Sequence, residues 1–260
     1  MRIHDFYRNE ALISLNGSIA SLIPVCFIIV GNLSFLKNQD IMLLAIPFFV
    51  YSFISFQFYL YKRNQSNSIS KQLISRNGNG LLLDAQQLLV LHMNTTSSSL
   101  QLYFSNGFLA GSFEKVPKRG KEWRQPYKIY VLRSSEQFPL AFFVVKKQNG
   151  IKIEVYDQNK KYMGCLVKKN EPFKKDKKEL FNETGELIGM IEGSPGFMDE
   201  KMWNLHEKQE GRLRRGWMPL QWSALFPNPN TPVLSFKVDL SQGDRLIRMS
   251  LLINEFFLER

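Results

Sequence analysis

The stretch LSFKVDLSQGDRLIRMSLLINEFFLER, residues 234–260, changes its periodicity part-way along. From Leu234 to Leu240, apolar and polar residues alternate, which predicts a strand. Ser241 and Asp244 then have the Ser-x-x-acid spacing of a helix capping box. We therefore expect a strand followed by a helix over about residues 242–260.

The predicted C-terminal helix is apolar around most of its circumference. At about 100° per residue, its charged side chains fall within one arc of roughly 100°; they are Asp244, Arg245, Arg248, Glu255 and Glu259. Apolar side chains occupy most of the rest, about twice the width found on ordinary surface helices. We expect this helix to be enclosed on most sides, with one charged edge emerging. A helix packed flat on a sheet is the alternative.

Strand patterns dominate the residues before this helix. Residues 100–113 read as a hairpin around Asn106-Gly107, and residues 140–156 read as a second hairpin around Asn149-Gly150. Residues 81–93 fit either a helix or a strand, and Gly193–Pro232 has the composition of a loop.

A weak internal repeat follows the second hairpin. Tyr156–Gly164 and Phe181–Gly189 each contain an aromatic residue, an Asp or Asn that begins a turn, an apolar pair and a glycine at equal spacing. This pattern predicts a strand, a tight turn and a strand, used twice. A succession of such units is typical of a sandwich or a barrel.

The order of these elements resembles the tubby-like C-terminal domain, whose superfamily includes the tubby, LURP-one-related and phospholipid scramblase proteins. The resemblance covers roughly residues 100–260 and is carried by Tyr156–Gly164, Phe181–Gly189 and Leu234–Phe257. It implies a closed antiparallel barrel of about twelve strands around a hydrophobic helix. The expected fold class is thus α+β, with a mainly antiparallel barrel that encloses the C-terminal helix.

Two apolar runs lie near the N-terminus. Ala11–Leu36 and Ile41–Tyr61 contain no charged residue, and each has the roughly 20 residues that a membrane-spanning helix needs. We expect a hairpin of two transmembrane helices within residues 1–63. A signal peptide is less favoured because a second run follows at once. A buried helix pair is less favoured because phenylalanines leave the second run without a polar face.

The flanks of the two runs predict their orientation. Basic residues lie before the first run and after the second, whereas Lys37 is the single basic residue between them. Both termini and the C-terminal domain are therefore expected in the cytoplasm, with the protein in the cell membrane. The Gly17-x-x-x-Ser21 pattern suits close packing between the helices. Neither run contains an ionisable Asp, Glu, Lys, Arg or His, so we expect no transport path.

Residues 64–80 are rich in Ser, Asn and Gly and are expected to form a linker to one domain over residues 81–260. Cys26 and Cys165 fall in different parts of the chain, so they cannot form a disulfide within that domain. This distribution fits a reducing compartment.

Sequence signatures of catalysis are absent. The sequence has no Gly-x-Ser-x-Gly, His-Glu-x-x-His, Walker or Gly-x-Gly-x-x-Gly motif. His4, His92 and His206 are far apart, and no Cys/His spacing suggests a zinc site. We expect no enzyme activity, no metal and no cofactor.

The net charge of +11 includes three basic clusters that contain aromatic residues. The candidate binding residues are Lys115, Lys118, Arg119, Lys121, Trp123, Arg124, Lys174, Lys175, Lys177, Lys178, Arg212, Arg214, Arg215 and Trp217, with Trp222 as a further interfacial aromatic. Beside a cytoplasmic leaflet they would meet anionic lipid headgroups. Such runs are also common in solvated loops. Nucleic acid is less favoured because acidic residues interrupt the clusters.

The sequence thus indicates a membrane-anchored, non-enzymatic domain that binds anionic lipid headgroups or a membrane-protein partner at the cytoplasmic face. The alternative is a scaffold or regulatory protein without lipid specificity, such as a toxin–immunity or transporter-associated component.

The predicted orientation can be tested by labelling. In a chain whose own two cysteines are replaced by serine, Asn38→Cys should react with a membrane-impermeant maleimide added to intact cells, because the connection between the runs is expected outside. A cysteine at Asn67 should react only after permeabilisation. The opposite pattern would reverse the topology.

Overall fold

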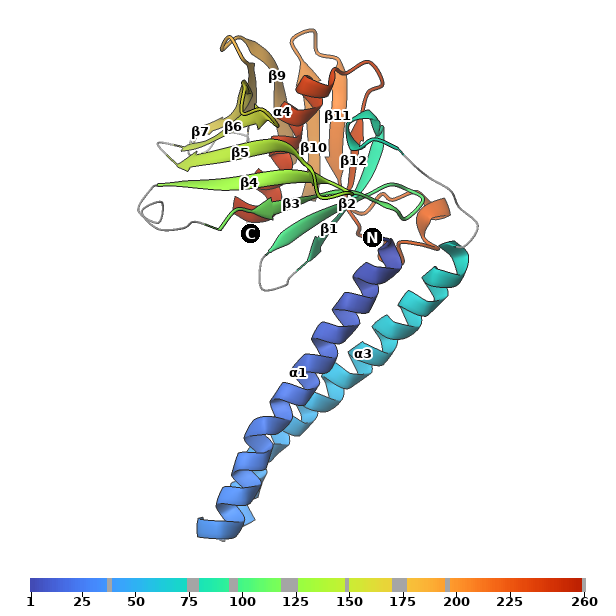
Figure 1. The fold of residues 1–260 in the computed structure, drawn as a ribbon, viewed down its shortest axis with the longest axis vertical. Coiled ribbons are helices and arrows are strands. Elements are labelled where there is room, and N and C mark those ends of the chain that lie inside the picture. Colours follow the sequence, from blue (N-terminus) through green and yellow to red (C-terminus); the bar gives the residue numbers. More distant parts are fainter. Residues whose placement is uncertain are drawn as a thin grey trace. The chain divides into compact units, whose positions relative to one another are not determined.

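The structure is a computed structural model that describes residues 1–36, 39–73, 80–93, 98–117, 126–147, 150–169, 177–194 and 197–258. The chain divides into two compact units, Met1–Arg76 and Asn77–Arg260. The first is a helical hairpin and the second is a barrel of strands with a helix inside it (Figure 1).

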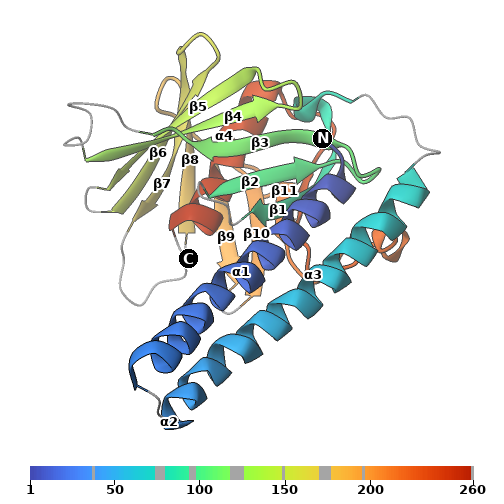
Figure 2. The same ribbon diagram turned by 60° about the horizontal axis from the view of Figure 1, so that its bottom comes forward.

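The hairpin consists of two long antiparallel helices that lie side by side (Figure 2). They are α1 (Ile3–Gly31), continued by a π-helical turn at Asn32–Leu36, and α3 (Ile46–Leu73), preceded by the short α2 (Gln39–Met42) and a 3-10 turn at Leu43–Ala45. α1 begins eight residues before the predicted span 11–36, and α3 continues twelve residues beyond the predicted span 41–61. Residues 64–73, expected as linker, are helical because no Gly or Pro interrupts them, and Ser and Asn alone do not end a helix.

Small buried residues lie where α1 and α3 meet. Ser18 and Ser52 share a hydrogen bond of 3.0 Å between their hydroxyl oxygens, and Ser52 also donates to the Ser18 carbonyl at 3.0 Å. Gly17 and Ser21, which the sequence suggested for this contact, are half-buried beside Ser18. Side-chain hydrogen bonds of this kind help to hold helices together where lipid offers no hydrophobic driving force.

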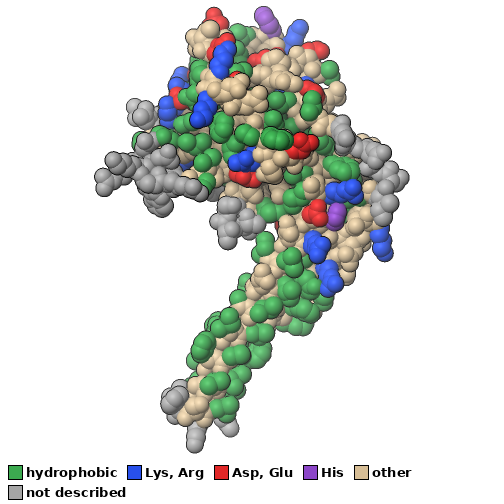
Figure 3. Space-filling model, viewed as in Figure 1, with side chains coloured by type: hydrophobic (Ala, Val, Ile, Leu, Met, Phe, Trp, Pro, Cys, Tyr) green, Lys and Arg blue, Asp and Glu red, His purple; other side chains and the backbone are tan. Residues whose placement is uncertain are grey.

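Apolar side chains cover much of the visible surface of the hairpin, with charged ones gathered near one end, whereas the visible face of the barrel mixes apolar and charged side chains throughout (Figure 3). The segments Ile3–Ser34 and Asp40–Leu73 have mean hydropathies of 2.1 and 1.9 over their most apolar windows, of which only 17% is buried. The chain therefore has two helices long and apolar enough to span a membrane.

The second unit is a closed barrel of twelve antiparallel strands, in which each strand pairs with the next along the chain and the last pairs with the first. The strands are β1 (Gln87–Met93), β2 (Ser99–Tyr103), β3 (Leu109–Lys115), β4 (Tyr127–Ser134), β5 (Pro139–Lys147), β6 (Gly150–Asp157), β7 (Tyr162–Lys169), β8 (Lys177–Asn182), β9 (Leu187–Ser194), β10 (Phe197–Asn204), β11 (Gln209–Arg214) and β12 (Val233–Phe236).

This topology confirms the α+β fold class and both predicted hairpins, which are β2–β3 and β5–β6. The ambiguous segment 81–93 contains a 3-10 turn at Leu82–Asp84 and then β1. The prediction of a loop over Gly193–Pro232 was wrong, because β10 and β11 occupy much of it. The strand expected from Leu234 to Leu240 ends at Phe236.

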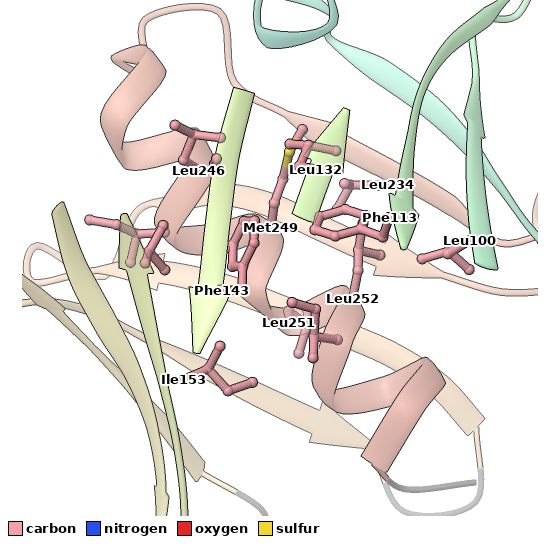
Figure 4. Close-up of a cluster of buried hydrophobic side chains, with 14 of the residues drawn as sticks. Leu100, Phe113, Leu132, Phe143, Ile153, Leu234, Leu246, Met249, Leu251 and Leu252 are labelled. Atoms are coloured by element: carbon pink, nitrogen blue, oxygen red, sulfur yellow. The ribbon is translucent and has the colours of Figure 1, made fainter. Parts of the chain in front are cut away.

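The C-terminal helix α4 (Gln242–Ile253), continued by a π-helical turn at Asn254–Leu258, runs through the middle of the barrel. Ser241 caps it as predicted and accepts the backbone N–H of Asp244 at 3.1 Å. Every residue from Arg245 to Ile253 is buried. Met249, Leu251 and Leu252 lie among inward-pointing strand residues that include Phe143 and Leu234 (Figure 4).

The expectation that a charged edge of α4 emerges was wrong, because Arg245 and Arg248 are also buried. Arg245 donates hydrogen bonds to the carbonyls of Ala85, Lys237, Val238 and Leu240. Arg248 forms an ion pair with Glu210 of β11 and donates to the Asp244 carbonyl at 3.3 Å. The barrel thus pairs both guanidinium groups internally, as buried charges require, although the Nε of Arg248 has no hydrogen-bond partner among the described residues.

A second buried ion cluster lies where α4 ends. The amine of Lys178, on β8, is 2.8 Å from a Glu200 oxygen and 3.1 Å from a Glu255 oxygen. Burial alone would lower the pKa of Lys178, but the two carboxylates outweigh that effect and raise it. Ion pairs therefore connect both ends of α4 to barrel strands.

Five connections between strands share one turn geometry. In residues 104–108, 134–138, 157–161, 182–186 and 204–208, the first N–H bonds to the fifth carbonyl and the fourth N–H bonds to the first carbonyl. The fourth residue has a positive φ in each, from 56° at Glu207 to 84° at Gly107 and Gly185. This is a type I turn followed by a residue in the left-handed region, a common hairpin loop.

Three of these turns begin with an Asp or Asn whose side chain accepts two backbone N–H groups: Asp157, Asn182 and Asn204. The first two confirm the repeat predicted from the sequence. The third, Trp203–Gly211, has the same aromatic, Asn and Gly spacing and lies in the segment expected to be a loop. Its glycine and the other two lie where a side chain would collide; a Cβ at Gly164 would be 2.2 Å from the Phe181 carbonyl oxygen.

The buried ion cluster makes a prediction about stability. Lys178→Met should lower the free energy of unfolding by roughly 3–5 kcal/mol, because it leaves two carboxylates buried without their cation. Lys177→Met, at the exposed neighbouring position, should change it by less than about 0.5 kcal/mol. Urea unfolding of the full chain in detergent micelles, followed by tryptophan fluorescence, measures both. Equal effects of the two substitutions would contradict the assignment.

Candidate functional site

The barrel has two ends that differ in their connections. Because successive strands are antiparallel, alternate connections meet at the same end. At one, the turn end, lie the five tight turns and the passage from β12 to α4. At the other, the loop end, lie the connections 94–98, 116–126, 148–149, 170–176, 195–196 and 215–232. Loops of varied length on a regular scaffold are where proteins commonly carry their binding residues.

The two ends also differ in charge. The loop-end connections contain seven Lys or Arg and three Asp or Glu, whereas the turn-end connections (104–108, 135–138, 158–161, 183–186, 205–208 and 237–241) contain four Lys and five Asp or Glu. Of the seven basic residues in the loop-end connections, Arg215 is the one that lies within the described residues.

Half of the candidate residues lie outside the residues that the structure describes: Lys118, Arg119, Lys121, Trp123, Arg124, Lys174 and Lys175. Of the strands that flank them, β3 ends and β4 begins at the loop end, as do β7 and β8. Lys115 and Lys177, the described residues next to these segments, are exposed.

Lys178 does not belong to this surface, so its prediction as a binding residue was wrong. Its side chain is 0% exposed and lies between Glu200 and Glu255 inside the barrel. Successive side chains of a strand point to opposite faces, so Lys178 points inward with Leu180 while Lys177 points outward. Trp222 is likewise buried and is excluded as an interfacial aromatic.

The third cluster is described in full. The Arg214 guanidinium lies 3.8 Å from the centre of the Trp217 ring, which is 68% exposed, and Arg215 is exposed beside it. A guanidinium over an indole ring is a favourable cation–π contact that leaves the charge accessible. Arg212 instead donates two hydrogen bonds, of 2.6 and 2.7 Å, to the carboxylate of Asp199. Its charge is therefore compensated within the barrel wall.

Two exposed apolar residues at the loop end were missed by the sequence analysis. Phe197, 81% exposed, begins β10 next to the last residues of β11, and Leu220, 88% exposed, begins a 3-10 turn (Leu220–Trp222). The signal for Phe197 was an aromatic directly after Pro195-Gly196, in a segment read as loop. With Trp217 they give the basic end an apolar component.

Within the described residues, no group of three or more His, Cys, Asp or Glu side chains could hold a metal ion. His206 is in the β10–β11 turn, at the turn end. His92 is on β1, where its Nε2 lies 2.8 Å from the Ser98 hydroxyl. The two histidines thus lie at different ends of the barrel.

No protein-family model matches the sequence, and no curated protein matches it either. Among solved structures, an X-ray structure of a protein from Arabidopsis thaliana is similar, with 12% sequence identity and a TM-score of 0.41. The matched region covers 67% of this chain and 96% of that chain.

The Asp199–Arg212 pair predicts a pH dependence. Its hydrogen bonds hold the pKa of Asp199 below the ordinary value of 3.8. A carboxyl whose folded pKa is depressed contributes stability above its unfolded pKa and loses it as the pH falls through the folded pKa. The free energy of unfolding of wild type should therefore be about 1 kcal/mol higher than that of Asp199→Asn near pH 7. This difference should shrink below about pH 4.

Urea unfolding of both proteins between pH 2.5 and pH 7 measures this difference. Arg212→Gln removes the cause of the shift and should abolish the same pH dependence. A difference between wild type and Asp199→Asn that does not vary with pH would contradict the assignment.

Proposed function

We propose that the helical hairpin anchors the chain in the cell membrane, with both termini and the barrel on the cytoplasmic side, and that the loop end binds anionic lipid headgroups. The observation that carries the lipid half is the described loop-end cluster, in which Arg214 lies over the exposed Trp217 beside the exposed Arg215. The connections 116–126 and 170–176, which join strands that end there, add six Lys or Arg in the sequence.

The anchor is supported by the exposed apolar surface of the hairpin, which a soluble protein rarely presents. At the end of this apolar surface that lies far from the α1–α3 connection, polar contacts are found. Lys62 pairs with Glu10 at 2.7 Å, and the Arg63 guanidinium lies over the Tyr59 ring. Basic and tyrosine side chains of this kind mark the level at which a span leaves the hydrocarbon.

The expected strength of lipid binding follows from electrostatics. Each Lys or Arg close to an anionic leaflet contributes about 1 kcal/mol, and the effect fades within a Debye length of about 8–10 Å. An anchored domain experiences a high effective concentration of lipid, so even a weak individual contact is occupied. Trp217, Phe197 and Leu220 would add apolar contact at the headgroup level.

We also propose that the barrel is a member of the tubby-like superfamily. The support is the order of its elements, a strand meander closed around a hydrophobic helix that follows the last strand. In this chain α4 is enclosed by the barrel and held by ion pairs, so membrane insertion falls to α1 and α3 and not to α4.

The lipid proposal can be tested on residues 77–260, which form a compact unit with their own core. Replacing Lys118, Arg119, Lys121 and Arg124 by glutamine should weaken flotation with vesicles containing 30% phosphatidylserine at least tenfold, because four charges near the surface are lost. The matched control replaces the four turn-end lysines by glutamine and should change flotation less than twofold. These lysines are Lys160, Lys161, Lys208 and Lys237.

Raising the salt concentration from 0.1 to 0.5 M should weaken binding of the unmodified domain. Equal binding to neutral and anionic vesicles, or no binding to either, would exclude the lipid function. Crosslinking that recovers one stoichiometric membrane protein, without lipid preference, would support the scaffold alternative instead.

A further inference from the structure

The connection 215–232 is folded, yet it leaves two large apolar side chains in solvent. Trp222 and Phe226 are buried, and the Phe226 N–H donates to the Trp222 carbonyl at 2.8 Å. Trp217 and Leu220, in the same connection, are exposed. Burying a large apolar side chain is favourable, and this connection buries others of the same kind. The two exposed side chains are therefore presented on a folded support.

A third exposed apolar side chain comes from the neighbouring strand. The Arg215 N–H donates to the Met198 carbonyl at 2.9 Å, which continues the antiparallel pairing of β10 with β11. Phe197 therefore comes opposite Gly216, the residue before Trp217. Gly216 has a φ of 81°, so the chain turns sharply there as it leaves β11. We call the three exposed side chains the apolar tip: Phe197, Trp217 and Leu220.

The surroundings of the apolar tip are positively charged. The two loop-end connections that form it contain no Asp or Glu. The Arg214 guanidinium lies over the Trp217 ring, and Arg215 is exposed. Asp199, opposite Arg214 in the sheet, already accepts two hydrogen bonds from Arg212. Exposed aromatic and aliphatic side chains beside basic ones are typical of segments that lie at the boundary between headgroups and acyl chains.

The turn end offers an internal comparison, because it also exposes large apolar side chains. They belong to three different connections and are Phe138, Leu205 and Val238. Each has an acidic residue within two positions, and these are Glu136, Glu207 and Asp239. An anionic leaflet repels such carboxylates, whereas it attracts the arginines beside the apolar tip. Charge therefore favours the apolar tip over the turn end as the part of the barrel that enters a bilayer.

We propose that the apolar tip inserts to the boundary between headgroups and acyl chains, with Arg214 and Arg215 at the phosphates. Binding at the loop end then depends on lipid packing as well as on charge, because insertion needs gaps between headgroups and is sensitive to curvature. Salt screens the charge contribution but does not remove the gain from apolar burial. The proposal rests on the lipid binding proposed above and deepens it, since it names how far the contact reaches.

The depth of the apolar tip can be measured on the full chain. Cys26 and Cys165 are replaced by serine, an environment-sensitive dye is placed on Leu220→Cys, and the protein is reconstituted in vesicles containing 30% phosphatidylserine. A nitroxide on carbon 5 of the acyl chains should quench this dye at least about twofold more than a dye on Leu205→Cys, the matched leucine at the turn end. The difference should persist in 0.5 M salt, because the anchor keeps the barrel at the membrane.

The dependence on packing can be measured by flotation of residues 77–260. Phe197→Ser combined with Leu220→Ser should weaken binding at least about tenfold, because two apolar side chains no longer enter the bilayer. Phe138→Ser combined with Leu205→Ser, at the turn end, should change it less than about twofold. Without these substitutions, vesicles of about 30 nm should be bound at least about threefold more tightly than vesicles of about 200 nm with the same composition.

Equal quenching of the two dyes, or quenching that disappears in 0.5 M salt, would overturn the insertion. Equal binding to both vesicle sizes would contradict the dependence on packing. Flotation with anionic vesicles but no quenching contradicts the insertion alone and leaves headgroup binding in place. Absence of both contradicts the lipid proposal, and the insertion with it. A photocrosslinker on Leu220→Cys that recovers one membrane protein, without quenching, would assign the apolar tip to a protein partner instead.

Discussion

The structure depends on filling a closed barrel with one helix. A twelve-stranded barrel encloses more space than its own inward side chains fill, and α4 supplies the missing apolar volume. Apart from Asp244 in the first turn, the charges of α4 oppose the helix dipole, since Arg245 and Arg248 lie in its first turns and Glu255 lies past its last. The barrel must therefore provide their partners. A rotation or shift of α4 would leave a charge buried and unpaired, so these contacts fix how the helix sits.

Much of this arrangement could be predicted from residues 234–260, because an apolar arc of about twice the usual width has no place on a protein surface. The charged arc could not be assigned in the same way. Whether Arg248 faces water or Glu210 depends on which strand lies beside it, and the sequence does not contain that information locally. For Lys178 the information was present. Lys178 alternates with Leu180, but it also belongs to a run of lysines, and that run favoured an exposed binding cluster.

The turns show the same division between local and distant information. Two copies of the aromatic, Asp or Asn, and Gly pattern were recognised because hydrophobic strands surround them. The third, Trp203–Gly211, lies among charged residues that hide its strands. The sequence did not predict β10 and β11, but this does not change which connections lie at the loop end. A hairpin adds two strands, so each connection around it stays at the same end of the barrel. What the sequence could not show was that Phe197, Leu220 and Trp217 share that end, because this depends on which connections follow which strands.

The position of α4 after all twelve strands has a consequence for biosynthesis. β1 can pair with β12 before the helix has been made, but the contacts of Arg245 with Ala85 and of Gln242 with Asp84 form only afterwards. During translation, at roughly 5–20 residues per second, the hairpin emerges first and the strands follow with their apolar inner faces unfilled for several seconds. A nascent barrel without its central helix is a natural client for a chaperone. Insertion of the hairpin while the chain is still being synthesised would keep such unfinished barrels apart from one another.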